Sequence, residues 1–423
     1  MTVRMADVSL LIHDLNAAVS PSGSGPVRGS ALRELRMVSP ASIAIAGDRI
    51  VAVGSPGDVL SEISGSSRYE AIDGRGKAAV PGLVDCHTHA AFLGDRAEEF
   101  ELRCRGASYE EIHQSGGGIL STVAATRGGS QDDLTAAVRR HLGWMLEHGT
   151  TTAEVKSGYG LDHETELKQL RAANDGATGS PVDVVLTFLG AHTVPPEFTY
   201  AGDYIDFVVE EVLPEAARYA KAADVFVERG AFEVPDARRY LRACAQHGLA
   251  LRMHGDQFSE RGAIPLAVEL GARSVDHLEA TTDRGTKLLA RSEVAAVMLP
   301  ACALFLGLRY PPARALVEEG AIVALASDFN PGSSFCESLP TVMNLACTQM
   351  GLSPSEALTA CTANAAHVLD VGDEVGRLAP GYKADVLVID SPDWRHLAYH
   401  LAGDRFATVV KAGRPVRYDR SPL

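Results

Sequence analysis

Short apolar runs recur along the chain between residues 80 and 330, and longer stretches of mixed polarity separate them. Each run is nearly continuous in apolar residues, which is typical of a strand in a parallel sheet covered on both faces. Eight such runs occur, at residues 82–89, 151–156, 182–189, 223–228, 249–254, 273–277, 294–299 and 321–327. Eight strands that alternate with helices are the number that closes a (β/α)8 barrel. We therefore predict an α/β fold with a TIM-like barrel over residues 76–372.

The stretches between the runs show helical spacing. Within residues 131–148, Leu134, Val138 and Leu142 recur at helical intervals, and Ser130 precedes them as an N-cap. The first two runs are separated by about sixty residues, far more than an ordinary connection takes. This insertion contains three consecutive glycines at 116–118. We expect it to shape or cover the active site.

The two ends of the chain differ from its middle. Residues 1–75 contain β-type runs such as 8–12 and 42–53, and residues 373–423 contain others at 384–389, 407–411 and 415–418. Neither flank has enough strands for a separate domain. We predict that the two flanks pair into one small composite β-domain beside the barrel.

Charge, cysteine content and the lengths of the apolar runs limit the partners and the cellular location that the protein can have. With 39 lysine and arginine residues against 54 aspartate and glutamate residues, the formal charge of −15 repels nucleic acid and anionic lipid. Seven cysteines without a Cys-x-x-Cys pair fit neither a disulfide framework nor a thiolate zinc site. The first residues lack the features of a signal peptide, and the longest apolar run, 294–308, is too short to span a bilayer. We expect a cytoplasmic protein that binds neither nucleic acid nor membrane.

Histidine and aspartate residues stand where the predicted strands end. His87 and His89 are two positions apart, and side chains so spaced on a strand point to one face. His254, His277 and Asp328 follow three further runs. Because the active site of such a barrel lies at the carboxyl ends of its strands, we expect these side chains to meet. Three imidazoles and one carboxylate suit zinc or a similar divalent ion with one coordination position open for water.

Such an ion lowers the pKa of its bound water from about 15.7 to about 7 and so gives hydroxide at neutral pH. We expect Asp328 to bind the metal, to accept the proton of that water and to pass it to a leaving nitrogen. His277 is expected to orient the hydroxide and to polarise the substrate.

Several longer motifs resemble a known family. The segment Pro-Gly-Leu-Val-Asp-Cys-His-Thr-His, the histidines after strands five and six and the aspartate after strand eight resemble the amidohydrolase superfamily. Within it, the chain resembles the imidazolonepropionases from about residue 40 to its end. The closer match is carried by the segments 154–161, 188–196, 254–258, 327–334 and 343–350.

This resemblance implies an activity in histidine degradation. The ring of 4-imidazolone-5-propanoate would be opened hydrolytically to N-formimidoyl-L-glutamate with one Zn²⁺ or Fe³⁺ per subunit. The resemblance also implies a homodimer. The choice between zinc and iron stays open at this point.

The resemblance assigns roles to matching positions. It implies that the metal ligands are His87, His89, His254 and Asp328, and that His277 takes part in catalysis. It implies substrate contacts for Arg96, Tyr159, His192 and Gln257, and product contacts for Tyr159, Asn330, Gly332 and Ser333.

The chemistry of several of these residues is consistent with the roles that the resemblance implies. Arg96 can clamp a propionate through two parallel hydrogen bonds. Tyr159 stands between two glycines, on a turn that can bring a hydroxyl to the ring. The turn that begins at Asn330 offers backbone amides and hydroxyls to a carboxylate.

Two departures from the family pattern remove no ligand: Cys86 stands where proline is common, and Gly255 where alanine is common. The run 223–228 ends without a lysine, which favours a site with one metal ion. Lys156 is interpreted as structural or electrostatic. Two other readings stay open, a metal-dependent deaminase of a nucleobase-like ring and a non-catalytic assembly protein that keeps the fold.

Overall fold

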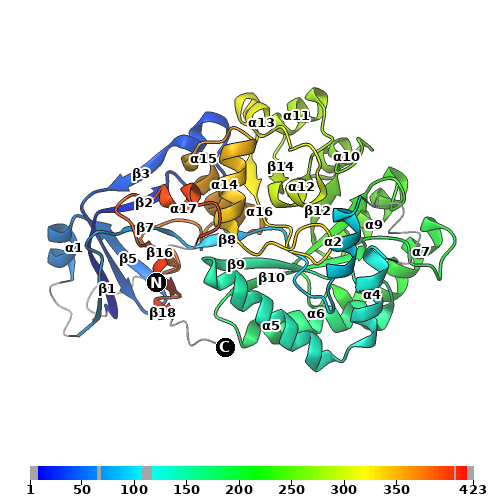
Figure 1. Ribbon diagram of the computed structural model, residues 1–423, viewed down its shortest axis with the longest axis horizontal. Helices are drawn as coiled ribbons and strands as arrows, with labels where there is room; N and C mark the ends of the chain where they lie inside the picture. Colours follow the sequence, from blue (N-terminus) through cyan, green and yellow to red (C-terminus); the bar gives the residue numbers. More distant parts are fainter. Residues whose placement is uncertain (1–7, 64–67, 107–116, 404–405, 417–423) are drawn as a thin grey trace.

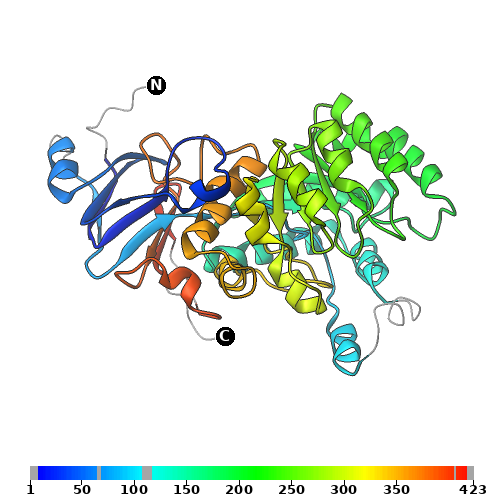
Figure 2. The same cartoon turned by 90° about the horizontal axis from the view of Figure 1, so that it is seen from above.

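The structure is a computed structural model that describes residues 8–63, 68–106, 117–403 and 406–416. It has two parts, which lie side by side in Figure 1 and again in Figure 2, the view from above. The larger part holds a parallel sheet with its helices, and the smaller part holds two further sheets built from both ends of the chain.

The larger part contains an eight-stranded sheet in which neighbours in sequence are neighbours in space. All seven pairs that join these strands are parallel. The strands are β8 (Leu83–Asp85), β9 (Thr150–Lys156), β10 (Asp183–Ala191), β11 (Ala222–Val227), β12 (Ala250–Gly255), β13 (Ser274–His277), β14 (Ala295–Met298) and β15 (Val323–Leu325). Each overlaps one of the eight predicted runs, so the predicted barrel is confirmed.

The first and last strands meet just beyond their carboxyl ends. The Asp328 amide donates to the His87 carbonyl at 3.0 Å, and the His89 amide donates to the Phe329 carbonyl at 3.0 Å. Thr88 and Phe329 form a parallel bridge. The barrel is thus closed by the two segments that carry the predicted metal ligands of strands one and eight.

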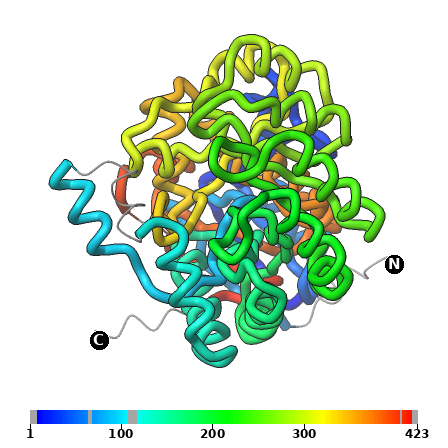
Figure 3. Tube along the Cα trace, turned by 90° about the vertical axis from the view of Figure 1, so that its right-hand side faces the viewer, coloured from blue at the N-terminus to red at the C-terminus, as the bar shows by residue number. Residues whose placement is uncertain are grey.

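Helices surround this sheet, as the end-on view in Figure 3 shows. The predicted helix over 131–148 is α5, which begins with a capping box between Ser130 and Asp133. The α-helices from the insertion onward are α2 (Ala97–Cys104), α4 (Ile119–Gly128), α5 (Gln131–Glu147), α6 (His163–Thr178), α7 (Ala201–Phe207), α8 (Leu213–Ala216), α9 (Val234–Gln246), α10 (Ala263–Leu270), α11 (Asp283–Ala290), α12 (Pro300–Leu306), α13 (Ala313–Glu319), α14 (Leu339–Gln349), α15 (Pro354–Thr359), α16 (Ala365–Val368) and α17 (His396–Tyr399). Short π-helical segments lie at Val208–Val212 and Ala360–Asn364.

The insertion between β8 and β9 supplies α2, α4 and α5. Figures 2 and 3 show α2, in cyan, projecting from the body of the molecule. Its apolar side chains include the half-exposed Phe100, whose ring stacks on that of Phe305 with centroids 5.5 Å apart. Part of the insertion, with the first of the three consecutive glycines, lies outside the described residues.

The smaller part joins the two ends of the chain. A four-stranded sheet has the order β5-β4-β1-β6, and a six-stranded sheet has the order β18-β17-β16-β7-β2-β3. In the second sheet β7 pairs in parallel with β2 and antiparallel with β16, so it links strands from residues 1–75 to strands from residues 373–423. The predicted composite β-domain of the two chain ends is therefore confirmed. The strands are β1 (Leu10–Leu15), β2 (Ala17–Pro21), β3 (Leu35–Val38), β4 (Ala41–Ala46), β5 (Arg49–Gly54), β6 (Glu70–Asp73), β7 (Ala78–Pro81), β16 (Val386–Ile389), β17 (Phe406–Lys411) and β18 (Arg414–Val416), and they are joined by α1 (Pro56–Glu62) and a 3-10 turn at Gly29–Arg33.

Two details of the smaller part go beyond the sequence prediction. The predicted run 42–53 is a hairpin of β4 and β5, because Gly47 turns the chain with a φ of 59°. The predicted run 415–418 continues beyond the described residues. Among the described residues, no helix is both long and apolar enough to cross a membrane.

Candidate metal centre and active site

Four residues from three strand ends face one another at the mouth of the barrel. His87 and His89 follow β8, His254 lies on β12, and Asp328 follows β15. All four side chains are buried. His87 Nε2 lies 3.5 Å from Asp328 Oδ1, His89 Nε2 lies 3.4 Å from the same oxygen, and His254 Nε2 lies 3.2 Å from His89 Nε2. The structure therefore brings together all four predicted metal ligands.

The spacing of these atoms fits a metal ion. Ligand atoms about 2.0–2.1 Å from a tetrahedral centre stand about 3.3 Å apart, close to the separations in this cluster. His87 Nε2 and Asp328 Oδ1 are buried and have no hydrogen-bond partner among the described residues. Buried polar atoms normally have partners. Three imidazoles and one carboxylate with such atoms fit a zinc-like ion.

Two of the imidazoles are oriented by buried carboxylates. His87 Nδ1 lies 2.6 Å from Asp276 Oδ2, and His254 Nδ1 lies 3.0 Å from Asp224 Oδ2. Each contact occupies one ring nitrogen and leaves Nε2 to face the cluster. Carboxylates behind metal-binding histidines have this effect in many metalloproteins.

The protonation states of the cluster residues favour metal binding. Burial lowers the pKa of His87 well below its ordinary value. Burial also lowers the pKa of His254 to about 4, although Asp224 acts in the opposite direction. Burial opposes ionisation of Asp328, but its contacts with His87 and His89 hold its pKa well below the ordinary value. At neutral pH, His87 and His254 are thus neutral and Asp328 is ionised, which are the forms that bind metals.

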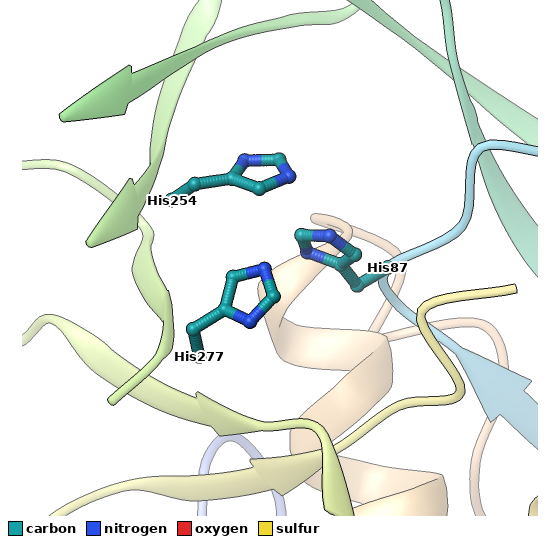
Figure 4. Close-up of side chains that lie close together, drawn as sticks. All are labelled: His87, His254 and His277. Carbon is teal, nitrogen blue, oxygen red and sulfur yellow. The ribbon is translucent and has the colours of Figure 1, made fainter. Parts of the chain in front are cut away.

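His277 ends β13 and turns toward the same cluster, as Figure 4 shows with His87 and His254. Its ring centroid lies 5.7 Å from that of His87 and 5.3 Å from that of His254. Its Nδ1 lies 3.4 Å from Glu279 Oε1. Although burial opposes protonation, Glu279 raises the pKa of His277 above its ordinary value. His277 therefore keeps a proton more readily than His87 or His254 does.

The backbone is strained where these side chains leave their strands. His277 has a φ of 87° and Asp328 a φ of 55°, in the left-handed region that non-glycine residues rarely adopt. Such strain costs about 1–3 kcal/mol per residue and is common at functional sites. Both turns lie at the carboxyl ends of strands of the barrel, where they direct a side chain into the mouth.

A buried ionic network lies beneath the cluster. Lys156 Nζ is 2.7 Å from Asp224 Oδ2, 2.7 Å from Glu154 Oε2 and 3.9 Å from Asp276 Oδ2. Arg252 forms a further ion pair with Glu154. Burial opposes the charge of Lys156, but the carboxylates around it, Asp224 first, raise its pKa. The interpretation of Lys156 as an electrostatic residue agrees with these contacts.

Tyr159 and His192 lie against the metal cluster. The rings of His192 and His89 are stacked, with centroids 5.1 Å apart, and the Tyr159 ring lies 5.9 Å from His89 and 5.5 Å from His192. His192 Nδ1 donates to the Gly158 carbonyl at 3.0 Å. Burial lowers the pKa of His192 well below its ordinary value. This side of the mouth is therefore lined by neutral aromatic rings.

Arg96 packs on the turn that follows Asp328. A Cβ on Gly332 would lie 2.0 Å from Arg96 Nη1, so only glycine leaves room for the guanidinium. The side chain of Arg96 is 8% exposed, and its Nε donates to Thr122 Oγ1 at 3.0 Å. The predicted carboxylate clamp and the predicted product-binding turn therefore touch each other.

Asn330 organises that turn from within. Its Oδ1 accepts from the amides of Gly332 and Ser333 at 2.8 Å each, and its Nδ2 donates to the Asp328 carbonyl at 2.6 Å. Ser333 Oγ donates to Asp328 Oδ2 at 3.2 Å. A ligand that used the two amides would have to displace the Asn330 side chain. Contact of this turn with product stays a prediction.

Gln257 follows β12 and is buried, and its Nε2 donates to Cys302 Sγ at 3.5 Å. Each of the predicted substrate residues, together with His277, thus lies at the barrel mouth or at the turn after Asp328 against which Arg96 packs. Their contacts with a substrate stay predictions.

Comparisons with known proteins identify the family. The model of the amidohydrolase family matches residues 78–416. The imidazolonepropionase of Rubrobacter xylanophilus is 70% identical over 97% of this chain and 99% of its own length. That of Chloroflexus aggregans is 46% identical, again over 97% of this chain and 99% of its own. The chain belongs to the imidazolonepropionase family.

Distant structures agree on the fold of this imidazolonepropionase family member. An adenosine deaminase from Xanthomonas campestris with bound zinc superposes with a TM-score of 0.69 at 17% identity, over 96% of this chain and 92% of that one. At this identity the likeness supports the fold alone. Family membership makes the chain a hydrolase, which excludes the alternative of a non-catalytic assembly protein.

Sequence reasoning missed three of the buried side chains that build this imidazolonepropionase site. Asp224 contacts His254, Asp276 contacts His87, and Cys302 faces the mouth from α12. Asp224 interrupts the otherwise apolar strand β11, and an ionisable residue in such a run was a usable signal. Cys302 carries no such signal, because buried cysteine is common.

Proposed function

We propose that this protein hydrolyses 4-imidazolone-5-propanoate to N-formimidoyl-L-glutamate in histidine degradation. The observation that carries the proposal is the buried cluster of His87, His89, His254 and Asp328, in a chain 70% identical to a protein named imidazolonepropionase. The fold and the family are those of metal-dependent hydrolases, and the cluster fits one metal ion.

His87, His89, His254 and Asp328 would hold that ion, which we propose to be Zn²⁺ or Fe³⁺, one per subunit. When bound, it supplies Lewis acidity, which acidifies water and polarises a carbonyl. The remaining steps belong to the side chains of the chain itself.

Asp328 is the proposed base. Ser333 holds its Oδ2, and its depressed pKa keeps it ionised until a proton arrives from water. The water oxygen adds to the ring carbonyl carbon, and the carbon–nitrogen bond of the cyclic amide breaks. Asp328 then returns the proton to the departing nitrogen, so that one water is consumed and no net proton is released by the base.

His277 is the proposed electrophilic partner. Its pKa, raised by Glu279, keeps an N–H available to the carbonyl oxygen as negative charge develops there. A donor fixed by a buried carboxylate needs little reorganisation during the reaction. We propose His277 and Asp328 as the catalytic residues.

The substrate is held by the other residues of the mouth. We propose that Arg96 binds the propionate, because a guanidinium can match both carboxylate oxygens. The ring would lie between the aromatic side chains and Gln257. The proposed contacts are Arg96, Tyr159, His192, Gln257, Asn330, Gly332 and Ser333.

The decisive assay follows the loss of imidazolone ultraviolet absorbance with metal-quantified protein, with and without a chelator. We expect metal-dependent ring opening and no free ammonia. Ammonia release would favour the deaminase reading, and inactivity of fully metallated protein would contradict the proposal. Asp328→Asn should reduce kcat by orders of magnitude while the fold is kept, and near-normal turnover of metallated Asp328→Asn would remove Asp328 as the base.

We also propose a homodimer in the cytoplasm, without nucleic-acid or membrane partners. The formal charge of −15 supports the absence of nucleic-acid and anionic-membrane partners. Sedimentation equilibrium of the metallated protein tests the dimer, and a single species of monomer mass over a wide concentration range would contradict it.

A further inference from the structure

Cys302 is a buried thiol at the barrel mouth for which the proposed reaction has no use. It lies on α12, just after β14, and its side chain is fully buried. One donor atom from each of His277, Cys302 and Asp328 lies within 4.8 Å of the other two. Gln257 Nε2 contacts the sulfur at 3.5 Å from another side. The thiol therefore faces the two proposed catalytic residues.

The three side chains form a donor set of their own. A thiolate, an imidazole and a carboxylate together suit zinc and its softer relative cadmium. Ligand atoms around such an ion stand about 3.3–3.7 Å apart. Atoms already within 4.8 Å reach that spacing by side-chain rotation. Asp328 belongs also to the first metal cluster, where its Oδ1 faces His87 and His89. A ring nitrogen of His277 lies within 4.8 Å of ring nitrogens of His87 and His254.

We propose that Cys302, His277 and Asp328 form a second, inhibitory site for a borderline-soft divalent cation such as excess Zn²⁺ or Cd²⁺. The sulfur–metal bond forms as the thiol proton leaves to solvent, without oxidation or reduction. Asp328 Oδ2, now held by Ser333, turns to the second ion while Oδ1 stays with the first cluster.

Inhibition follows from the identity of the ligands. An ion bound to His277 and Asp328 takes the hydrogen-bond donor and the base away from the reaction. Activity should therefore rise with the first equivalent of zinc and fall with excess zinc. Zinc that is needed for activity at one equivalent would thus inhibit the enzyme in excess.

The test uses full-length protein loaded with one equivalent of zinc and titrated with cadmium chloride. We expect the wild-type protein to take up a further equivalent with a cadmium–thiolate charge-transfer band in the ultraviolet. Cys302→Ala should lose this band. Cys347→Ala, which removes a half-buried thiol on α14, is the matched control and should keep it.

The readout is binding rather than turnover, so the result does not depend on the proposed substrate. Cadmium affinity at the second equivalent should fall at least about tenfold in Cys302→Ala, because losing even an outer partner of a metal ligand weakens binding about 10- to 100-fold. His277→Ala should weaken the second equivalent but not the first.

Two results would overturn the proposal. One is a wild-type protein that binds no further cadmium beyond its first metal, and the other is a Cys302→Ala protein with an unchanged thiolate band. Cys302→Ser provides a smaller change of volume if the alanine variant does not fold. In turnover assays, excess zinc should inhibit wild type and Cys347→Ala but inhibit Cys302→Ala much less.

Discussion

At the scale of single residues, burial and neighbouring carboxylates determine which imidazoles at the barrel mouth carry a proton. Burial keeps His87 and His254 neutral, whereas Glu279 raises the pKa of His277. The residue types and their strand-end positions could be predicted from sequence, because period-two spacing and apolar runs are local signals. The pairing of a ring with its carboxylate could not be predicted from the sequence, because Asp276 and His87 are 189 positions apart in the chain.

The carboxylate behind His87 should control metal affinity. Asp276→Asn keeps the shape of the side chain but removes the charge that orients Nδ1 at 2.6 Å. We expect metal affinity to fall about 10- to 100-fold. Competition with a chromophoric chelator measures it. Asp203→Asn changes an exposed carboxylate on α7 and serves as the control, and equal affinities in the two variants would refute the role of Asp276.

A second residue-scale prediction concerns pH and stability. His141 is buried, its Nδ1 donates to the Ala90 carbonyl at 2.8 Å, and burial lowers its pKa to about 4. In the unfolded chain His141 therefore becomes protonated near pH 6.5, whereas in the folded protein it becomes protonated only near pH 4. This contribution to stability is complete above pH 6.5 and is lost as the pH falls toward 4.

Urea unfolding of metal-free protein at pH 7 and pH 5 measures this effect. His141 alone should contribute a loss of about 2 kcal/mol between these two values. His141→Asn, which can still donate to the Ala90 carbonyl, should show a loss smaller by that amount. Parallel pH profiles of the two proteins would contradict the prediction.

At the scale of elements, α6 fixes the loop that carries Tyr159. The Glu166 carboxylate accepts from the amides of Gly158, Gly160 and Leu161 at 2.9–3.1 Å, and Gln169 Oε1 accepts from the Tyr159 amide at 3.0 Å. The strand before the loop and the helix after it were visible in the sequence. Their mutual contacts were not, because a glutamate near a helix N-terminus most often lies in solvent.

Glu166→Gln tests whether this loop serves the substrate. A glutamine has one acceptor oxygen where the carboxylate has two, so at least one of three loop amides loses a strong partner. We expect KM to rise roughly tenfold, as loss of a hydrogen bond to a charged group predicts, with a smaller change in kcat. Steady-state kinetics measures both. Glu164→Gln, an exposed neighbour on α6, should leave KM unchanged, and an unchanged KM in both variants would disprove the role.

At the scale of the whole molecule, the buried Lys411 of the smaller part forms an ion pair with the partly exposed Asp183 of the barrel. Lys411 Nζ on β17 lies 2.7 Å from Asp385 Oδ2 and 2.7 Å from Asp183 Oδ2 at the start of β10. The barrel and the union of both chain ends could be predicted, because strand count and composition are properties of the whole sequence. Division of the chain at residues 75 and 372 stays a prediction, and β7, within the predicted barrel range, pairs with β16.

Removing this junction should destabilise the protein without changing its chemistry. The side chains of Lys411 and Asp385 are each 3% exposed, so Lys411→Met leaves a buried carboxylate without its partner. Breaking a buried pair in this way costs about 3–5 kcal/mol, whereas replacing both partners is often nearly neutral. We therefore expect a clear fall in Tm for Lys411→Met and a partial recovery when Asp385→Asn is added. Lys287→Met, at an exposed position on α11, should leave Tm unchanged.

Metal affinity is the second property to measure in the Lys411→Met variant. It lies at the carboxyl ends of the strands, whereas Asp183 begins β10 at the other end of the barrel. Below the melting transition, Lys411→Met should therefore bind metal with wild-type affinity. A loss of metal affinity equal to that of Asp276→Asn would mean that the smaller part holds the catalytic mouth in shape. A wild-type Tm for Lys411→Met would instead mean that the Lys411 ion pairs contribute no net stability.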